Sequence, residues 1–324
     1  MSLLSTEIMR KLIEPGPRLP WLVGWLTAEV WSDSRFSDLS PEDYLSQGEK
    51  LLHGVEELLA VAAGGVYDEL ATASKATHPL TDTLVDQTSV VVFDGASIRE
   101  APLFRHKAEE SGFEIVGDAV TYAALPSETV DFVEQRVIGK RLAPKQLPGR
   151  TELKERGIKA FYFPDAIASQ SIAAENGDAF LFWSAFPDVT YKDSDARFAR
   201  HFSDMQVLYD AAWKNTVMQV PRDRRIVVTS DHGYIFFGAG FESTRPDNAC
   251  AALNHDRSKR FTADEALPGH GDYPDLQVFP EERLAMVRGR LKNRPRGPSA
   301  NLVYRHGGLS LMEMVVPWIV LERK

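Results

Sequence analysis

The chain has 324 residues, 44% of them hydrophobic and 26% charged, which is the composition of a soluble globular protein with a sizeable core. There are 46 acidic and 37 basic side chains, giving a net charge of −9. This balance excludes non-specific coating of nucleic acid, because that mode of binding depends on positive charge. No run approaches the roughly 18 apolar residues that span a bilayer, so we expect no membrane segment.

The N-terminus and the cysteine content favour a reducing compartment. Cys250 is the only cysteine, so a disulfide within the chain is impossible. The first residues do not form a secretory signal peptide, because the charged side chains of Glu7, Arg10 and Lys11 follow at once. We therefore expect a cytoplasmic protein.

Residues 1–85 are predicted to form a helical N-terminal segment. The sequence Ser-Pro-Glu-Asp at 40–43 is typical of a helix start, since serine can cap, proline suits the first turn and acidic side chains favour the positive end of the dipole. Apolar residues then recur at nearly helical spacing up to Gly64 and Gly65. The apolar stretch 20–31 is too short to span a membrane and is expected to pack on the core.

Residues 86–324 are predicted to form an α/β domain with a mainly parallel central sheet flanked by helices. Strand patterns are found at 89–93, 113–125, 158–163, 179–186, 225–230, 301–305 and 314–322. Helical patterns lie between them, most clearly at 195–216, and such alternation is typical of this fold class. Residues 240–300, rich in Pro, Gly and polar side chains, are expected to pass over the active face without forming a separate domain.

Five of the predicted strands end in residues that can bind metal or react. These ends carry Asp94, the stretch Ser127–Thr129, Asp188, the pair Asp231 and His232, and His306. A single aspartate after a strand is most often a helix cap, but the carboxyl ends of parallel strands converge on one edge of a sheet. Carboxylate, imidazole and alkoxide ligands suit Zn²⁺ or Mn²⁺, so we predict a metal site at this edge.

The order of these motifs resembles that of the alkaline phosphatase superfamily. It runs through Asp-Gly at 94–95, Pro-Ser-Glu-Thr at 126–129 with Gly139 ten residues later, Pro-Asp at 187–188, Ser-Asp-His-Gly at 230–233 and His-Gly-Gly at 306–308. More narrowly, the closing sequence at 305–321 is similar to the end of PglZ domains. The resemblance covers about residues 89–324, and its most specific pieces are SDHGY and HGGLSLMEMVVP. It implies an alkaline phosphatase-like arrangement of the sheet.

The resemblance also implies roles for individual residues. Asp94, Asp231 and His232 match the protein ligands of one metal ion, which the nucleophile also contacts. Thr129 matches the nucleophilic threonine, and Ser127 is its near rival. The implied cofactor is zinc, as one or two ions, with manganese as an alternative.

The second metal position departs from the family pattern. Asp188 and His306 match two of its ligands, but Lys192 stands where the superfamily has a His or, in many PglZ proteins, an Asp. A protonated lysine cannot bind a metal ion. Either Asp193 takes over this position, or the site holds one ion and Lys192 supplies the missing positive charge during catalysis, as in the sulfatases of the superfamily.

These residues predict a metal-dependent phosphatase or phosphodiesterase, a hydrolase in which Thr129 attacks the phosphate ester. We expect nucleotides or oligonucleotides as substrates, and the resemblance to PglZ proteins implies a role in phage defence alongside other defence proteins. The alternative, which Lys192 keeps open, is a degenerate PglZ domain that binds a nucleotide or a protein without catalysis. A sulfatase is disfavoured because the Cys/Ser-x-Pro-x-Arg motif is missing.

Basic residues near the predicted site are candidates for binding the substrate phosphate. Arg305, at the end of a predicted strand, is assigned to substrate binding. Further candidates are Arg257, Lys259, Arg260, Arg294 and Arg296, for which a solvated loop face is the competing interpretation. His255 and His270 are candidate replacement ligands, whereas Ser97 is expected to cap a helix. The aromatic side chains of Phe182, Trp183 and Phe186 are expected to lie in the core.

Overall fold

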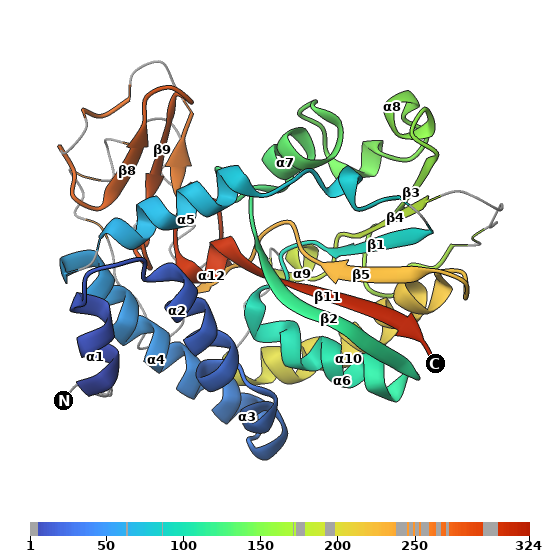
Figure 1. Ribbon diagram of the computed structural model, residues 1–324, viewed down its shortest axis with the longest axis horizontal. Helices are drawn as coiled ribbons and strands as arrows, with labels where there is room; N and C mark the ends of the chain where they lie inside the picture. The colour runs from blue at the N-terminus through green and yellow to red at the C-terminus, as the bar shows by residue number, and fades with distance from the viewer. Residues whose placement is uncertain are drawn as a thin grey trace.

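A computed structural model gives the fold around a six-stranded central sheet in the order β2-β11-β5-β1-β4-β3 (Figure 1). It describes residues 6–62, 64–85, 87–170, 172, 179–191, 198–237, 245, 249, 253, 259–263, 267–269, 272–293 and 304–324. The strands of the central sheet are β1 (Thr88–Phe93), β2 (Phe113–Tyr122), β3 (Ile158–Phe163), β4 (Ala179–Ser184), β5 (Arg225–Thr229) and β11 (Val315–Arg323). Strands β3, β4, β1 and β5 run parallel, and β11 is antiparallel to β5 and β2. The predicted α/β class with a mainly parallel central sheet is confirmed.

Helices cover both faces of this sheet. Val91 and Phe93 of β1 pack with α4 (Pro41–Ala62), α6 (Ala101–Glu110) and α10 (Phe198–Asn215), and the alternate side chains of the strand pack on the other face. That second face is covered by α7 (Thr129–Phe132), α8 (Thr151–Lys154) and the chain between them (Figure 1). Because successive side chains of a strand point to opposite faces, an uninterrupted apolar run is what a strand covered on both faces requires.

The described residues before β1 form helices and turns. They comprise α1 (Thr6–Ile13), α2 (Leu19–Trp25), α3 (Asp33–Asp38), α4 and α5 (Gly65–Ala76). Leu22 and Trp25 of the apolar stretch 20–31 are buried in the same apolar cluster as Val91, as expected. The N-terminal helices thus share a core with the sheet, and the division of the chain into 1–85 and 86–324 stays a prediction. Among the described residues, no helix combines the length and the apolarity needed to cross a bilayer.

Of the predicted strand at 301–305, the described residues 304 and 305 are not part of the central sheet, and for them this expectation was wrong. Its described residues, Tyr304–Arg305, form β10, which pairs antiparallel with β6 (Ile235–Phe236) in a separate two-stranded sheet. The physical reason is that β11 occupies the position beside β5 in the central sheet. The segment that precedes β11 therefore approaches the end of β5 from outside this sheet. The short helix α12 (Leu311–Met314) connects the two segments.

The described parts of residues 240–300 contain strands that the sequence did not predict. Strands β7 (Phe261–Thr262), β9 (Leu284–Val287) and β8 (Leu276–Phe279) form a three-stranded antiparallel sheet. This sheet lies beyond the end of the central sheet toward which β5 points (Figure 1). It has a small apolar cluster of its own, which includes Leu276 and Val287.

A buried ion-pair network joins the N-terminal helices to the rest of the chain. Glu49 of α4 is fully buried, and its carboxylate pairs with Arg99 at 2.6 Å and with Arg290. Arg99 also donates to the carbonyl oxygen of Tyr234 at 3.2 Å from two guanidinium nitrogens. Breaking a buried pair by removing one partner leaves an uncompensated charge in a medium of low dielectric constant, which is costly.

Glu49→Ala is therefore expected to lower the free energy of unfolding by about 3–5 kcal/mol, because Arg99 and Arg290 would lose their shared carboxylate. Urea titration followed by tryptophan fluorescence and far-UV circular dichroism measures this change. The matched control is Glu57→Ala in the same helix, whose side chain is 64% exposed. We expect the control to change stability by less than about 1 kcal/mol, and equal losses in both variants would contradict the role assigned to the network.

Candidate metal centre

The ends of β1 and β5 bring three candidate ligands together. The two strands are neighbours and run parallel, with Val92 opposite Thr229, so the residues that follow them emerge side by side. Asp94, Asp231 and His232 each offer a ligand atom, and these atoms lie within 4.8 Å of one another. All three residues are buried. The grouping of these residues at one edge is what the sequence predicted from parallel strand ends.

The hydrogen bond of His232 determines which ring nitrogen faces the cluster. Its Nδ1 lies 2.9 Å from the carbonyl oxygen of Gly233. A carbonyl oxygen can only accept, so Nδ1 carries a proton, and Nε2 is the ring nitrogen that faces the cluster. Nε2 lies 3.7 Å from Oδ1 of Asp94 and 3.7 Å from Oδ2 of Asp231. The imidazole is thus oriented so that Nε2 could bind a metal ion.

The two aspartates differ in how their oxygens are satisfied. Oδ1 of Asp231 accepts from the backbone N–H groups of Gly95 and His232, both at 3.0 Å, whereas its buried Oδ2 accepts no hydrogen bond from any described residue. For Asp94, Oδ2 accepts from the indole Nε1 of Trp183 at 3.1 Å. A buried carboxylate oxygen without a donor carries a full desolvation cost. A divalent cation beside Oδ2 of Asp231 would remove this cost, so the donor set fits a metal ion.

Of the two candidate hydroxyls, that of Thr129 faces the cluster. Its Oγ1 lies 3.2 Å from Oδ1 of Asp94 and 3.2 Å from Nε2 of His232. The hydroxyl of Ser127 instead donates to the carbonyl oxygen of Gly308 at 2.8 Å and accepts from the N–H of Gly307 at 3.0 Å. Ser127 therefore holds the loop that carries His306, and the assignment of Thr129 as nucleophile stays a prediction that this geometry favours.

Asp188 and His306 lie beside the first group. Asp188 begins α9 (Asp188–Tyr191), and its N–H donates to the carbonyl oxygen of Asp94 at 2.9 Å. Nε2 of His306 is 3.6 Å from Oδ1 of Asp188, and the imidazole stacks on that of His232 with ring centroids 4.1 Å apart. The residues predicted for the two metal positions, three for the first and two for the second, are therefore adjacent.

Glu128 is a neighbour of His306 that sequence reasoning missed. Its Oε1 lies 3.3 Å from Nδ1 of His306, which is also 3.2 Å from the carbonyl oxygen of Ser127. Burial, the largest single influence, would raise the pKa of Glu128, but the imidazole of His306 together with His232 and Lys259 outweighs burial, and the pKa is lowered. The carboxylate thus stays ionised next to His306. The only sequence signal was its place between Ser127 and Thr129.

Trp183 was predicted as a core residue, and it is buried as expected, along with Phe182 and Phe186. Its contact with Asp94 was not predicted. The register of β1 and β4 places Trp183 opposite Val92. Asp94 follows Val92 by two positions, so the side chains of Trp183 and Asp94 lie on the same face of the sheet. Strand pairing, which the sequence does not state, was needed to see this.

Two glycines allow the strand ends to approach. Gly95 has φ +78°, and a Cβ there would lie 3.1 Å from Cβ of Asp188. A Cβ on Gly233 would lie 2.1 Å from the carbonyl oxygen of Met312, which no side chain can avoid by rotating. Glycine is required where backbones meet this closely.

The remaining candidates divide into described and undescribed residues. Lys192, Asp193, Cys250, His255, Arg257, His270, Arg294 and Arg296 lie outside the described residues. Arg305 is half-buried in β10 and donates to the carbonyl oxygen of Tyr304 at 3.0 Å, so its role in substrate binding stays a prediction. Ser97 caps the 3₁₀ turn Ile98–Glu100 in a reciprocal capping box with Glu100, as expected.

Arg260 does not meet a substrate phosphate, and that expectation was wrong. The side chain is fully buried, and its guanidinium donates to both carboxylate oxygens of Glu313 at 2.8 and 3.0 Å. It also donates to the carbonyl oxygen of Gly289 at 2.6 Å. The charge of Arg260 is thus used within the fold, where it joins the 240–300 region to α12.

Comparisons with known proteins give weak structural likeness only. Searches with the sequence match no family model and no curated protein. The fold is similar to phosphonoacetate hydrolase from Sinorhizobium meliloti 1021 in complex with phosphonoacetate, at 13% identity and TM-score 0.39, over 74% of this chain and 90% of that one. It is also similar to an inactive murine ectonucleotide pyrophosphatase/phosphodiesterase 5 in complex with AMP, at 13% identity and TM-score 0.42, over 72% and 87%. We therefore argue function from the side chains themselves.

Trp183→Phe is expected to weaken binding of Zn²⁺ or Mn²⁺ by about 10- to 100-fold, because Asp94 would lose the hydrogen bond that orients its carboxylate. Competition with a chromogenic chelator measures the affinity. The matched control is Trp213→Phe, which removes an indole that donates to Ser111 at 3.1 Å. Equal affinities in the wild-type chain and both variants would show that the indole does not orient a metal ligand.

Proposed function

We propose that this chain is a metal-dependent phosphohydrolase with Thr129 as its nucleophile. The observation that carries the proposal is the position of the Thr129 hydroxyl, 3.2 Å from both Asp94 and His232, two members of the buried group that Asp231 completes. A nucleophilic hydroxyl at a buried group of two carboxylates and an imidazole is the arrangement that metal-assisted attack on a phosphate ester requires.

The residues present fit one ion at Asp94, Asp231, His232 and Thr129. Asp188 and His306 offer ligand atoms for a second ion beside it. A bound cation would lower the pKa of the Thr129 hydroxyl and offset the negative charge of the phosphate. Zinc is the ion proposed, with manganese as the alternative, since both accept carboxylate and imidazole ligands. With a single ion bound, Lys192 is proposed to supply the positive charge at the second position.

The reaction would proceed in two displacements. In the first, Oγ1 of Thr129 forms a bond to phosphorus while the bond to the leaving oxygen breaks. The hydroxyl loses its proton and the leaving alcohol gains one, so charge and atoms balance. In the second, water attacks the phosphothreonine, which releases the phosphate product and restores the hydroxyl. Before the attack, Asp94 orients Thr129, because its Oδ1 accepts the hydrogen bond of the hydroxyl.

The substrate class is proposed from charge and from the sequence resemblance. A net charge of −9 disfavours long nucleic acids bound through their backbones, so nucleotides or short oligonucleotides cleaved as phosphodiesters are the class proposed. The motifs SDHGY and HGGLSLMEMVVP resemble PglZ domains, and a role in phage defence, in the cytoplasm and with other defence proteins as partners, is proposed on that resemblance.

Thr129→Ala is expected to lower metal-dependent turnover of bis-p-nitrophenyl phosphate by about a thousandfold or more, because it removes the attacking oxygen. Thr129→Ser, which keeps a hydroxyl at the same position, should retain part of the activity. The assay uses chelator-treated chain with Zn²⁺ or Mn²⁺ added back, beside p-nitrophenyl phosphate and short oligonucleotides.

Ser127→Ala is the matched control, with its melting temperature measured because its hydroxyl holds Gly307 and Gly308. Loss of activity in a well-folded Ser127→Ala variant, with Thr129→Ala fully active, would contradict the choice of nucleophile. Metal binding without turnover of any ester would instead favour the non-catalytic binding module.

Asp231→Asn and Asp188→Asn are expected to separate the two metal positions. Asp231 contributes the oxygen that accepts no hydrogen bond from any described residue, so its replacement should abolish binding at the first position. Asp188→Asn should leave at least one ion bound per chain. Elemental analysis after gel filtration measures the metal content, and equal loss of metal in both variants would show that the positions are not independent.

A further inference from the structure

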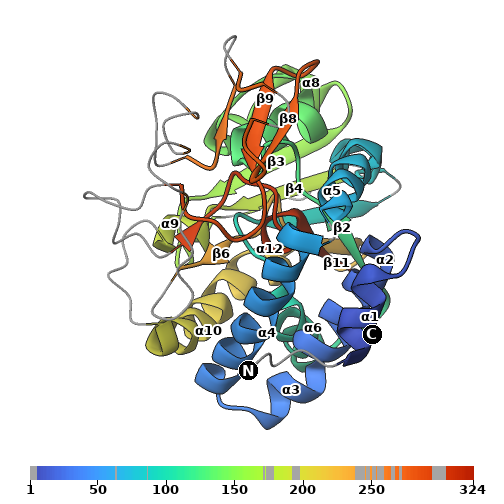
Figure 2. The same ribbon diagram turned by 90° about the vertical axis from the view of Figure 1, so that its left-hand side faces the viewer.

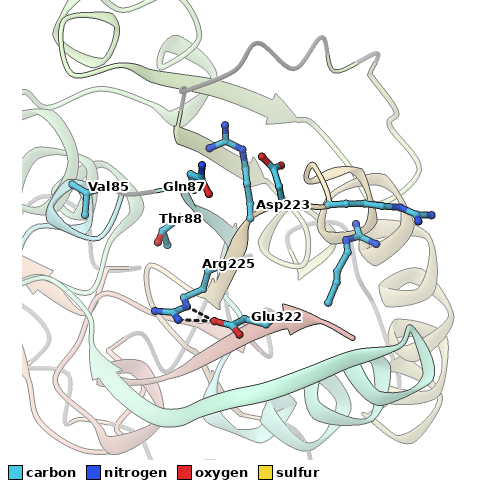
Figure 3. Close-up of a pocket in the computed structure, with 9 residues that line it drawn as sticks. Val85, Gln87, Thr88, Asp223, Arg225 and Glu322 are labelled. Atoms are coloured by element: carbon cyan, nitrogen blue, oxygen red, sulfur yellow. Dashed lines mark hydrogen bonds and ion pairs between the residues drawn. The ribbon is translucent and has the colours of Figure 1, made fainter.

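A second polar hollow lies at the opposite end of the central sheet from the candidate metal centre. It has a volume of about 560 Å³, which is in the range of small-molecule sites. Thr88 at the start of β1, Arg225 at the start of β5 and Glu322 near the end of antiparallel β11 lie around it (Figure 3). Because β1 separates the two ends, Thr88 at the hollow is roughly 20 Å from Asp94, six residues away at about 3.3 Å per residue.

Positive charge gathers in this hollow although the chain as a whole is acidic. Four arginines line it, Arg222, Arg224, Arg225 and Arg323, together with the carboxylates of Asp223 and Glu322. Arg225 is paired with Glu322, its Nε lying 2.8 Å from Oε1, as the dashed lines of Figure 3 show. Burial and the nearby charge of Arg222 both lower the pKa of Arg323. Like charges are therefore held close together here, which is unfavourable without an anion.

Arg224 is the buried group in this hollow that its surroundings leave unsatisfied. The residue is 4% exposed, and its guanidinium lies over the ring of Phe180, 4.6 Å from the ring centroid. Its Nε and Nη1 are buried and make no hydrogen bond with any described residue. A buried guanidinium whose donors lack acceptors is costly and calls for a ligand or an ion as explanation.

Buried nitrogens without a hydrogen-bond partner among the described residues are also found on other arginines, such as Nε of Arg99 and Nε and Nη1 of Arg290. Those two arginines pair with Glu49, and Arg245 pairs with Asp275 and Arg260 with Glu313. Arg224 makes no ion pair with a described carboxylate, although Asp223 and Glu322 line the same hollow. Its positive charge is therefore not offset by an ion pair among the described residues, at a site that is lined by further arginines.

We propose that this hollow binds the phosphate group of a small phosphorylated molecule, with Arg224 as the central ligand and Arg222 and Arg323 around it. The planar guanidinium group of an arginine can donate two hydrogen bonds to the oxygens of a phosphate group. The negative charge of a phosphate dianion would also neutralise the excess positive charge of the hollow. The hollow is larger than one phosphate group, so it has room for the rest of a small molecule. This site is separate from the candidate metal centre and does not depend on the proposed hydrolysis.

The test is calorimetric titration of the full chain, freed of metal and carrying Asp94→Asn, with pyrophosphate at about 0.15 M salt. Binding is expected in this chain, and adding Arg224→Met should weaken it by about tenfold or more, because a charge-assisted pair with the phosphate is lost. The matched control is Arg10→Met, which removes the same charge from an exposed position in α1. Inorganic phosphate and adenosine 5′-monophosphate are titrated alongside to distinguish free phosphates from a nucleotide as the source.

The melting temperature of each variant shows whether it is folded, so that a loss of binding can be distinguished from misfolding. Arg224→Met is expected to melt at or above the temperature of its parent, because it removes an unsatisfied guanidinium, and phosphate compounds should raise the melting temperature of the parent only. Arg222→Met, at an exposed position, should also weaken binding. This variant replaces Arg224→Met in the test if Arg224→Met does not fold. The proposal is overturned if none of the three compounds binds, or if Arg224→Met, or Arg222→Met in its place, binds pyrophosphate as tightly as the parent.

Discussion

The buried carboxylate of Asp231 is the constraint on which the candidate metal centre depends. One oxygen is satisfied by two backbone N–H groups, and the other is buried with no hydrogen-bond donor among the described residues, beside a second buried carboxylate, that of Asp94. Nε2 of His232 lies 3.7 Å from a carboxylate oxygen of each, which is too far for a hydrogen bond. Two carboxylates buried side by side are destabilising unless a proton or a cation offsets their charge.

Glu313 connects the loops that form the two halves of this centre. Its carboxylate accepts from the N–H of Gly308, in the loop of His306, and its carbonyl oxygen accepts from the N–H of Gly233, in the loop of His232. The same carboxylate pairs with the buried Arg260. The buried Glu313 and Arg260 therefore hold in place the two loops that carry His232 and His306.

The central sheet presents different chemistry at its two ends. The carboxyl ends of β1, β4 and β5 carry acids and imidazoles, whereas the opposite end carries arginines around a hollow. Strand direction accounts for the first arrangement, because parallel strands bring their carboxyl ends to one edge. The second arises where the antiparallel strand β11 ends beside the start of β5, which places Glu322 and Arg323 next to Arg224 and Arg225. Both ends would bind phosphate, one through metal ions and the other through guanidinium groups.

The sequence by itself determined the strands of the α/β sheet and the set of acids and imidazoles at their ends, because apolar runs and strand-end residues are local properties of the chain. The structure alone decided how these segments pair. Residues 304–305 lie outside the central sheet because β11 occupies the place beside β5. Only tertiary contacts showed that the hydroxyl of Ser127 is engaged by Gly307 and Gly308, that Trp183 bonds Asp94, and that Arg260 is paired and buried. Hydrogen bonds between residues far apart in the chain leave no periodic signal in the sequence. These contacts could therefore be identified only from the strand register and the burial seen in the structure.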